Sequence, residues 1–174
     1  LTETEEADII TSLEHKDRWH FARFLEWSID TGLRPSESRA LNRKQLSKDP
    51  DLGWIIKVYE TKTMHPRVIP LTDRALAVFN TISDELYPFA QFTKQAIRSA
   101  WAIVRAEFGE DDPDFVFYAC RHTCASRLVQ RNVPLQIVKE WMGHKTFDMT
   151  LRYAKLAPKN MLSAKKALEP QTTI

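Results

Sequence analysis

The sequence contains few glycines, few cysteines and no long apolar run. Four glycines in 174 residues leave little material for a glycine-rich loop that cradles nucleotide phosphates. Two cysteines, Cys120 and Cys124, are too few for a disulfide scaffold and suit a reducing compartment. Because the apolar runs are short, we expect neither a membrane-spanning helix nor a signal-peptide core. These absences favour one soluble globular domain, and the chain is long enough to bury a hydrophobic core.

The net charge is also small, but it is unevenly distributed. A formal charge of +2 argues against a protein that binds nucleic acid through bulk charge alone. Residues 1–30 carry 3 basic and 8 acidic residues, net −5, whereas residues 115–174 carry 10 basic and 3 acidic residues, net +7. The basic C-terminal third fits an anionic partner such as phosphate, or else a solvated basic helix face. The chain begins at Leu1 rather than Met, which favours a fragment of a longer protein.

Helical periodicity dominates the pattern. Apolar side chains within residues 17–31 recur at helical spacing, and Gly32 follows as a typical helix end. Thr93 is a typical N-cap for a long helix over residues 93–108. The other predicted helices span residues 5–13, 118–130 and 134–143, with a short one after Thr146 that carries Tyr153 and a weak one near 161–168.

Strand propensity is confined to the region between residues 45 and 71. Residues 54–59 are β-branched and aromatic, residues 67–71 are short and apolar, and residues 61–66 between them predict a turn. This pair predicts a β-hairpin, which a short strand near residues 45–47 can join. The expected fold class is therefore α+β and mainly α, a helical domain with a small antiparallel β-sheet.

The first candidate functional segment is TGLRPSE, residues 31–37. Gly32 is expected to end one helix and Pro35 to begin the next, which places Arg34 at a helix N-terminus. Such a position favours anions, and a guanidinium there strengthens it as a phosphate site. Glu37, three residues further on, can hold Arg34 in position. A surface Arg–Glu pair in a helix-linking turn explains the segment equally well.

The second segment is RHTCASRL, which begins at Arg121. Tyr118 and Arg121 share a helix face because they are three residues apart. Cys120 and Cys124 share a face with each other, and His122 is expected to project away from both sulfurs. A metal site of these three residues is therefore disfavoured, and buried, inert cysteines are the better interpretation.

The third segment is MGHKTFDMTLRYAKL, which begins at Met142. Its histidine, His144, follows a predicted helix end, so we expect the ring to be exposed in a turn. Tyr153 lies nine residues later, on the next short helix. A lone histidine or tyrosine is usually structural, but the two together in a basic segment suggest chemistry.

These three blocks, in this order, resemble the catalytic domain of tyrosine recombinases, the phage-integrase family. The resemblance covers about residues 1–157, and its last block is the most specific, because Gly-His followed nine residues later by Arg-Tyr-Ala is rare by chance. It implies a single catalytic domain over residues 1–174. The separate N-terminal DNA-binding domain usual in the family would then be missing from this chain. Residues 158–174 would form a tail that docks on a neighbouring protomer or frays.

The resemblance also assigns roles to individual residues. Tyr153 matches the nucleophile, which attacks the scissile phosphate to form a 3′-phosphotyrosyl link, and Arg34 and Arg121 match the arginines that clamp this phosphate. His144 matches a histidine that hydrogen-bonds the phosphate, and Glu37 matches the carboxylate that supports the arginines. Lys62 matches the general acid that protonates the leaving 5′-oxygen. Lys62 suits this role only if neighbouring cations lower its pKa from about 10.4. Otherwise it is a solvent-exposed turn lysine. No metal or cofactor is implied.

One position departs from the family pattern, which usually has His-x-x-Arg where this chain has Tyr118 three residues before Arg121. Tyr118 can donate a hydrogen bond to phosphate, but with a reference pKa of about 10 it is a poor base at neutral pH. We expect it to keep the hydrogen-bonding role and activity to survive; an impaired site is the alternative. His122 is not expected to substitute, because it lies one residue past Arg121 and should point off that face.

The implied function is site-specific DNA recombination by strand cleavage and rejoining. The alternatives are a type IB topoisomerase-like activity and a catalytically impaired or non-enzymatic DNA-binding relative. The implied partners are double-stranded DNA, further copies of the chain in a tetramer on paired DNA sites, and accessory DNA-bending proteins, with a monomer expected in isolation. The expected location is the cytoplasm of a bacterial or phage-infected cell.

Overall fold

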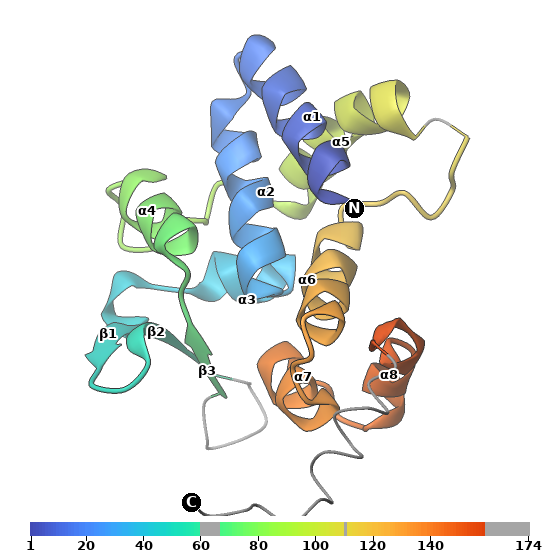
Figure 1. Ribbon diagram of the computed structural model, residues 1–174. Coiled ribbons are helices and arrows are strands. Elements are labelled where there is room, and N and C mark those ends of the chain that lie inside the picture. The colour runs from blue at the N-terminus through green and yellow to red at the C-terminus, as the bar shows by residue number, and fades with distance from the viewer. Residues whose placement is uncertain (60–66, 110, 159–174) are drawn as a thin grey trace, which may run out of the picture.

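The computed structural model describes residues 1–59, 67–109 and 111–158 (Figure 1). This part of the chain forms eight α-helices and a three-stranded antiparallel sheet, which confirms the predicted fold class. The helices are α1 (Glu3–His15), α2 (Trp19–Thr31), α3 (Pro35–Ala40), α4 (Asp73–Thr81), α5 (Lys94–Phe108), α6 (Ala119–Gln130), α7 (Leu135–Met142) and α8 (Asp148–Leu151). The strands are β1 (Leu46–Asp49), β2 (Gly53–Val58) and β3 (Arg67–Pro70), with short 3-10 helices η1 (Arg43–Gln45) and η2 (Ala154–Leu156).

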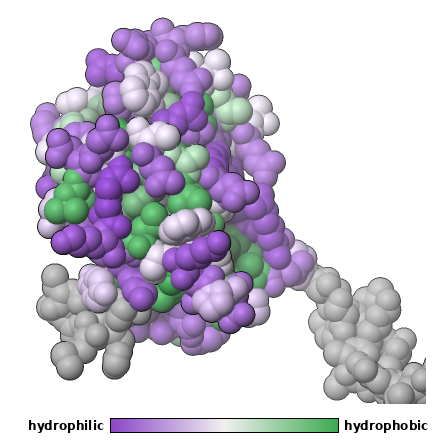
Figure 2. Space-filling model, turned by 90° about the vertical axis from the view of Figure 1, so that its left-hand side faces the viewer, coloured by the Kyte–Doolittle hydropathy of each residue, from purple (hydrophilic) through white to green (hydrophobic). Residues whose placement is uncertain are grey.

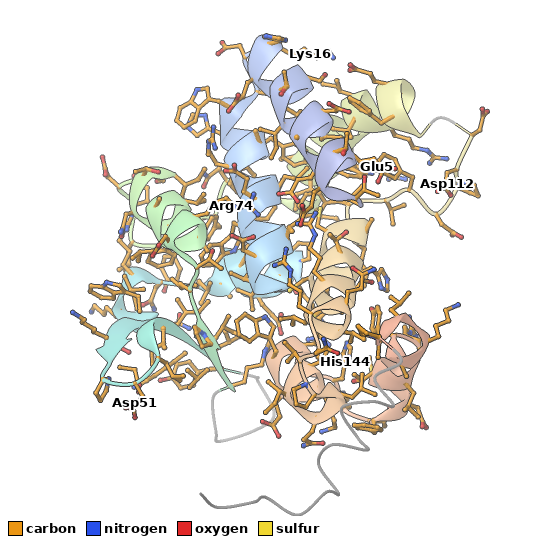
Figure 3. The ribbon with its side chains drawn as sticks, in the orientation of Figure 1. Glu5, Lys16, Asp51, Arg74, Asp112 and His144 are labelled. Atoms are coloured by element: carbon orange, nitrogen blue, oxygen red, sulfur yellow. The ribbon has the colours of Figure 1, made fainter. Side chains whose placement is uncertain are left out.

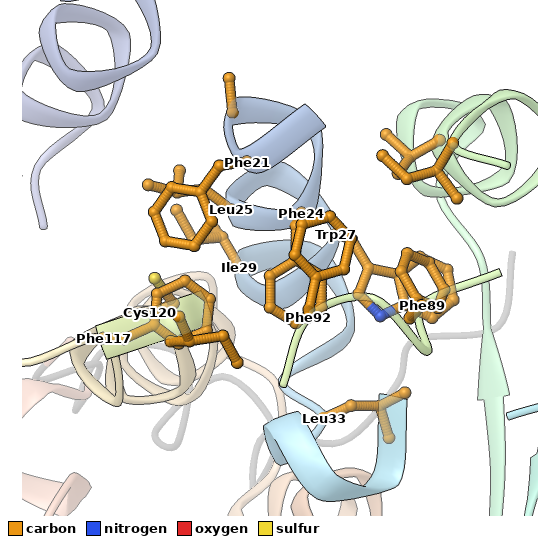
Figure 4. Close-up of a cluster of buried hydrophobic side chains, with 14 of the residues drawn as sticks. Phe21, Phe24, Leu25, Trp27, Ile29, Leu33, Phe89, Phe92, Phe117 and Cys120 are labelled. Carbon is orange, nitrogen blue, oxygen red and sulfur yellow. The ribbon is translucent and has the colours of Figure 1, made fainter. Parts of the chain in front are cut away.

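Helix α2 is the centre of the fold and contacts α1, α4 and α6 (Figure 1). Figure 4 shows its aromatic side chains within a cluster of buried rings. Phe24 stacks on Phe92 and on Phe117, with ring centroids 4.1 and 5.3 Å apart, and Trp27 stacks on Phe89 at 4.5 Å. Each such pair adds about 0.5–1.5 kcal/mol beyond the burial of its apolar area. The cluster therefore holds the segments before α5 and α6 firmly against α2.

Most helix ends follow from local sequence signals. Gly32 ends α2 in the left-handed conformation with φ of 64°, as predicted, and the Thr93 side chain accepts a hydrogen bond from the Ala96 N–H at 3.1 Å at the start of α5. Helix α1 is longer than the predicted 5–13, because Thr2 and Glu5 form a capping box that starts it earlier. Helix α4 is not among the predicted helices, although Thr72 caps it and Ala75, Val78 and Phe79 are buried at helical spacing.

The predicted hairpin is confirmed by the pairing of β2 with β3, and β1 completes the sheet on the other edge of β2. Ile56 lies opposite Leu46 on one side and Ile69 on the other, and both isoleucines are fully buried. The predicted turn at residues 61–66, the predicted helix near 161–168 and nearly all of the predicted docking tail lie outside the described residues.

The surface and the buried cysteines agree with a globular domain. The face in Figure 2 is mainly hydrophilic, with hydrophobic side chains in patches between polar ones. No helix within the described ranges is long and apolar enough to cross a membrane.

Cys120 and Cys124 are both free and buried, and burial raises the pKa of each thiol to about 12. They are therefore inert at neutral pH, as predicted.

Candidate active site

The candidate functional side chains meet where α2 ends, α3 begins, and α6, α7 and α8 converge. Figure 3 shows His144 at this junction, near α6, α7 and α8. The residues come from segments far apart in the chain, so the fold, rather than local sequence, brings them together.

Arg121 lies in the first turn of α6 and only 3% of its surface is exposed. Its guanidinium donates hydrogen bonds to the carbonyl oxygens of Gly32 and Met142. These carbonyls belong to the C-terminal ends of α2 and α7, where backbone oxygens lack helical partners and the helix dipoles favour a cation. Burial lowers the pKa of Arg121, and Arg34 nearby lowers it further, but a guanidinium remains charged. Arg121 thus holds a positive charge at the meeting point of three helices.

Glu37 organises two further arginines around one carboxylate. It accepts hydrogen bonds from the backbone N–H and the Nη1 of Arg34, at 2.7 and 2.9 Å. It also accepts a two-pronged pair from Nη1 and Nη2 of Arg67, both at 2.9 Å. Burial acts to raise the pKa of Glu37, but the bonds from Arg67 and Arg34 outweigh this effect and lower it. The carboxylate therefore stays ionised and fixes both guanidinium groups.

Arg67 is a site residue that the sequence reasoning missed. It is the first residue of β3, and besides Glu37 it binds the carbonyl oxygen of Trp141, with Nε and O 3.2 Å apart. It therefore ties the sheet to α3 and α7. The only signal for it was a basic residue at a strand end, which does not distinguish it from the many other arginines and lysines of the chain.

Gly143 supports this arrangement by its lack of a side chain. It ends α7 in the left-handed conformation with φ of 59°, and a Cβ there would lie 2.9 Å from Nη1 of Arg67. We expect Gly143→Ala to lower the free energy of unfolding by about 1–3 kcal/mol, because left-handed strain and displacement of Arg67 add together. Chemical denaturation of both proteins measures this loss.

Gly53→Ala is the matched control for this prediction. Gly53 also has positive φ, 71°, but a Cβ there would meet nothing within 4 Å. It should therefore show only the cost of the left-handed conformation, about 1 kcal/mol. Equal losses in the two variants would mean that the contact with Arg67 contributes nothing.

His144 is buried, with 7% of its surface exposed, so the predicted exposed ring is wrong. After the left-handed turn at Gly143, its backbone N–H bonds the carbonyl of Lys139 at 3.0 Å, and its Nδ1 lies 2.8 Å from Oγ1 of Thr150. Burial, together with Arg121 and other nearby cations, lowers the pKa of His144 to about 4. The ring is therefore neutral at pH 7. If the Thr150 hydroxyl donates to Nδ1, the ring proton is on Nε2 and can be donated to an anion.

Tyr153 is also buried, with 6% exposed, and follows α8 rather than lying within the helix as predicted. The predicted cap at Thr146 is likewise not formed, because α8 begins after Phe147 without a side-chain cap. The ring of Tyr153 lies nearly parallel to that of His144, with an interplanar angle of 5° and centroids 6.4 Å apart. Burial raises the pKa of the phenol, whereas Arg152 and Arg121 act in the opposite direction.

His122 lies in the site, contrary to expectation. Its Nδ1 is 2.6 Å from Oη of Tyr153, and its ring meets the ring of Tyr118 edge to face at 5.2 Å. The expectation was wrong because spacings of three and of four residues both share a helix face. Arg121 and His122, three and four residues after Tyr118, therefore both project toward the site. The position of Tyr153, which comes from beyond α8, could not be known from α6 alone.

Tyr118 is more exposed than the other site residues, at 40%. It immediately precedes α6 and borders a groove of about 450 Å³. The charged residues that line this groove are all basic, namely Arg34, Arg39 and Lys94. The groove therefore presents positive charge beside Tyr118 and Arg34, which suits an anionic ligand.

Two further sequence hypotheses concern residues near this site. Lys62, the proposed general acid, lies outside the described residues. The disfavoured metal site at Cys120, His122 and Cys124 does not form, and the described ranges contain no cluster of three or more histidine, cysteine or acidic residues that could hold a metal ion.

Comparison with known proteins connects this geometry to a family. A model of the phage integrase family matches residues 1–160. The chain belongs to the phage integrase family. Among curated integrases, that of Salmonella phage P22 is 28% identical over 155 residues, covering 79% of this chain and 39% of the relative. That of Haemophilus phage HP1 is 29% identical over 138 residues, covering 79% and 38%. The chain spans about two fifths of the length of these relatives.

Solved structures share the fold of this integrase-family chain. The catalytic domain of bacteriophage HP1 integrase aligns with a TM-score of 0.75 at 24% identity, covering 99% of this chain and 96% of that one. The XerH site-specific recombinase bound to palindromic difH substrate aligns with a TM-score of 0.72 at 16% identity, covering 98% and 53%. The Tn1549 transposon integrase in complex with transposon right end DNA gives 0.69 at 19% identity, covering 96% and 64%.

Proposed function

We propose that this domain catalyses the strand cleavage and rejoining of site-specific DNA recombination, with Tyr153 as the nucleophile. The observation that carries the proposal is the convergence of a buried tyrosine with two fixed guanidinium groups and a histidine that is neutral at pH 7. These side chains come from separate elements, the start of α3, α6, the end of α7 and the end of α8. Phosphodiester transfer requires this combination of a nucleophile and positive charge.

Arg121 and Arg34 are proposed to clamp the scissile phosphate. Two nitrogens of Arg121 are bound to helix-end carbonyls, which leaves further N–H groups of its five for the non-bridging oxygens. Arg34 is oriented by Glu37 and borders the basic groove. His144 donates the third hydrogen bond through Nε2. Because all three donors are held before DNA arrives, little reorganisation is needed as charge builds up on the phosphate.

The reaction follows from this placement. Oη of Tyr153 attacks the phosphorus, a bond forms between them, and the bond from phosphorus to the 5′-oxygen breaks. Lys62 is proposed to give the proton that the leaving 5′-oxygen needs. The product is a 3′-phosphotyrosyl ester with a free 5′-hydroxyl, and the ester retains the energy of the original bond. A 5′-hydroxyl from a second strand can therefore reverse the step, and no cofactor takes part.

Tyr118 is proposed to donate a hydrogen bond to the phosphate from the position where the family usually has histidine. We expect Tyr118→Phe to slow cleavage by about 10-fold or more, because a hydrogen bond to a charged group contributes roughly 1.5–3 kcal/mol. Single-turnover cleavage assays measure the loss. Tyr118→His should cleave at least as fast as Tyr118→Phe. A large gain of Tyr118→His over the wild type would instead show that the tyrosine limits proton transfer.

The function is tested by trapping the covalent intermediate. The protein is incubated with a library of nicked duplexes with randomised sequences, in which the nick releases the short 5′-hydroxyl fragment and prevents rejoining. We expect a denaturant-resistant protein–DNA adduct, with the nucleotide attached to the peptide that carries Tyr153 in mass spectrometry. Sequencing the trapped DNA identifies the preferred site. DNA binding without any adduct would favour the non-enzymatic alternative.

The partners are part of the same proposal. Double-stranded DNA is the proposed substrate, and the solved XerH and Tn1549 complexes with DNA support it. We further propose a tetramer on paired sites, a monomer in isolation, help from accessory DNA-bending proteins, and action in the cytoplasm. Recombinant products from two trapped sites would favour this assembly, whereas plasmid relaxation without recombinants would favour the topoisomerase-like alternative.

A further inference from the structure

The imidazole of His122 is placed against the reacting atom of the proposed reaction. Its Nδ1 lies 2.6 Å from Oη of Tyr153, which is a short hydrogen-bond distance. The donor and acceptor roles at this contact depend on the tautomer of His122: with the ring proton on Nε2, Oη donates its proton to Nδ1, and this is the tautomer that the proposal below uses. Within the described residues, no hydrogen bond other than this one is found for Oη.

We propose that His122 is a catalytic residue that accepts the proton of Tyr153 during cleavage and returns it during rejoining. This inference rests on the proposed function, which makes Tyr153 the nucleophile. The family resemblance assigns no catalytic role to His122, so this proposal adds a residue to the site.

The environment of His122 suits a proton acceptor. Burial lowers the pKa of His122, and Arg152 and Arg121 lower it further, so the ring is neutral and its acceptor nitrogen is available at pH 7. The lowered pKa also makes the neutral ring a weaker base, and the negative charge of the scissile phosphate, bound at Arg121 and Arg34, offsets the nearby cations and favours the imidazolium that forms. The ring is only partly buried, so solvent can exchange its proton between the two half-reactions.

The position of His122 also explains how the site can work without a histidine at position 118. Tyr118 and His122 are four residues apart and their rings are in contact, with centroids 5.2 Å apart. A base one helical turn further along α6 therefore reaches the same region of the site. The other histidine of the site, His144, has its Nδ1 engaged by Thr150, and the hydrogen bond of the Tyr153 hydroxyl is with His122, so His144 is assigned to the phosphate rather than to this proton.

The proposed step balances. The proton of Oη moves to Nδ1 as the bond from Oη to phosphorus forms. The bond from phosphorus to the 5′-oxygen breaks, and that oxygen receives a proton from a separate general acid. In rejoining, the imidazolium returns its proton to Oη as the phosphotyrosyl bond breaks. No oxidant, reductant or cofactor is required.

The test compares three substitutions in single-turnover cleavage of the trapped DNA. His122→Ala removes the base, and we expect the cleavage rate to fall by about 10²-fold or more. His122→Asn keeps a hydrogen-bonding group near the place of Nδ1 but cannot accept the proton, so it should be nearly as slow. His15→Gln is the control, because it removes an exposed histidine at the end of α1. Circular dichroism melting curves confirm that each variant is folded.

Two further measurements separate a base from a positioning group or an acid. Added imidazole should restore part of the activity of His122→Ala but not of His122→Asn, whose side chain fills the space. A substrate with sulfur in place of the bridging 5′-oxygen has a leaving group that needs no acid. A defect in His122→Ala that disappears with this substrate would place His122 on the leaving-group side and overturn the proposal.

The remaining outcomes are equally decisive. Wild-type cleavage rates in His122→Ala, or full activity in His122→Asn, would overturn the role of His122 while adduct formation by the wild type still supports the proposed function. Faster cleavage in His122→Ala would mean that the hydrogen bond restrains Tyr153 instead of activating it. If the wild type forms no adduct with any member of the library, the proposed function and the role of His122 are both wrong.

Discussion

Tyr153→Phe is expected to abolish the covalent adduct with nicked DNA, a loss on the order of 10³-fold or more, because phenylalanine has no oxygen to attack phosphorus. The substitution removes one atom, which in the wild type is hydrogen-bonded to Nδ1 of His122. The ring can still occupy its buried position beside His144. Non-covalent DNA binding should therefore remain, and a gel-shift assay beside the denaturing gel separates binding from chemistry.

The control for this prediction is Tyr87→Phe, which removes a phenol oxygen from an exposed tyrosine outside the candidate site. It should form the adduct at the wild-type rate. The thermal stability of both variants should stay close to that of the wild type. An adduct that persists in Tyr153→Phe would show that another side chain is the nucleophile, and mass spectrometry of that adduct would identify it.

Arg121→Lys is expected to reduce cleavage on the order of 10³-fold, although the charge is retained. An ammonium group cannot bind the carbonyls of Gly32 and Met142 in the fixed directions of a guanidinium and also reach the phosphate. One helix-end carbonyl is left without its partner, so the free energy of unfolding should fall by about 1–3 kcal/mol. The melting temperature should fall by roughly 3–10 °C as a result.

Arg18→Lys is the matched control, because Arg18 is exposed and precedes α2 at the end of the helix opposite to Gly32 and the phosphate clamp. It should change neither the cleavage rate nor the melting temperature. Adding saturating DNA should not rescue Arg121→Lys, since the lost interaction strengthens in the transition state. A variant that loses stability but cleaves normally would limit Arg121 to a structural role in joining α2, α6 and α7.

Several features of the fold could be predicted from sequence because their causes are local. Gly32 and Gly143 end helices through their positive φ, Thr93 caps α5, and the β-branched, aromatic and apolar residues of β2 and β3 indicate a hairpin. The α4 helix could also be predicted from local signals, because Thr72 caps it and its buried apolar residues recur at helical spacing. Thr146 looked like a cap but is not used, since the packing of α8 on α7 decides where α8 begins.

For the site, the sequence alone determined which residue types and motifs are present, and the order of three short blocks was enough to indicate a family. It also determined that Arg34 precedes a helix with Glu37 three residues on. Only the tertiary structure decided that Arg67 completes the Glu37 cluster, that His144 is buried, and that His122 faces Tyr153. The physical reason is that these contacts join residues 30 or more positions apart, or depend on how neighbouring helices pack. Helical periodicity shows which side chains of one helix share a face. It does not show which residues of other elements contact that face.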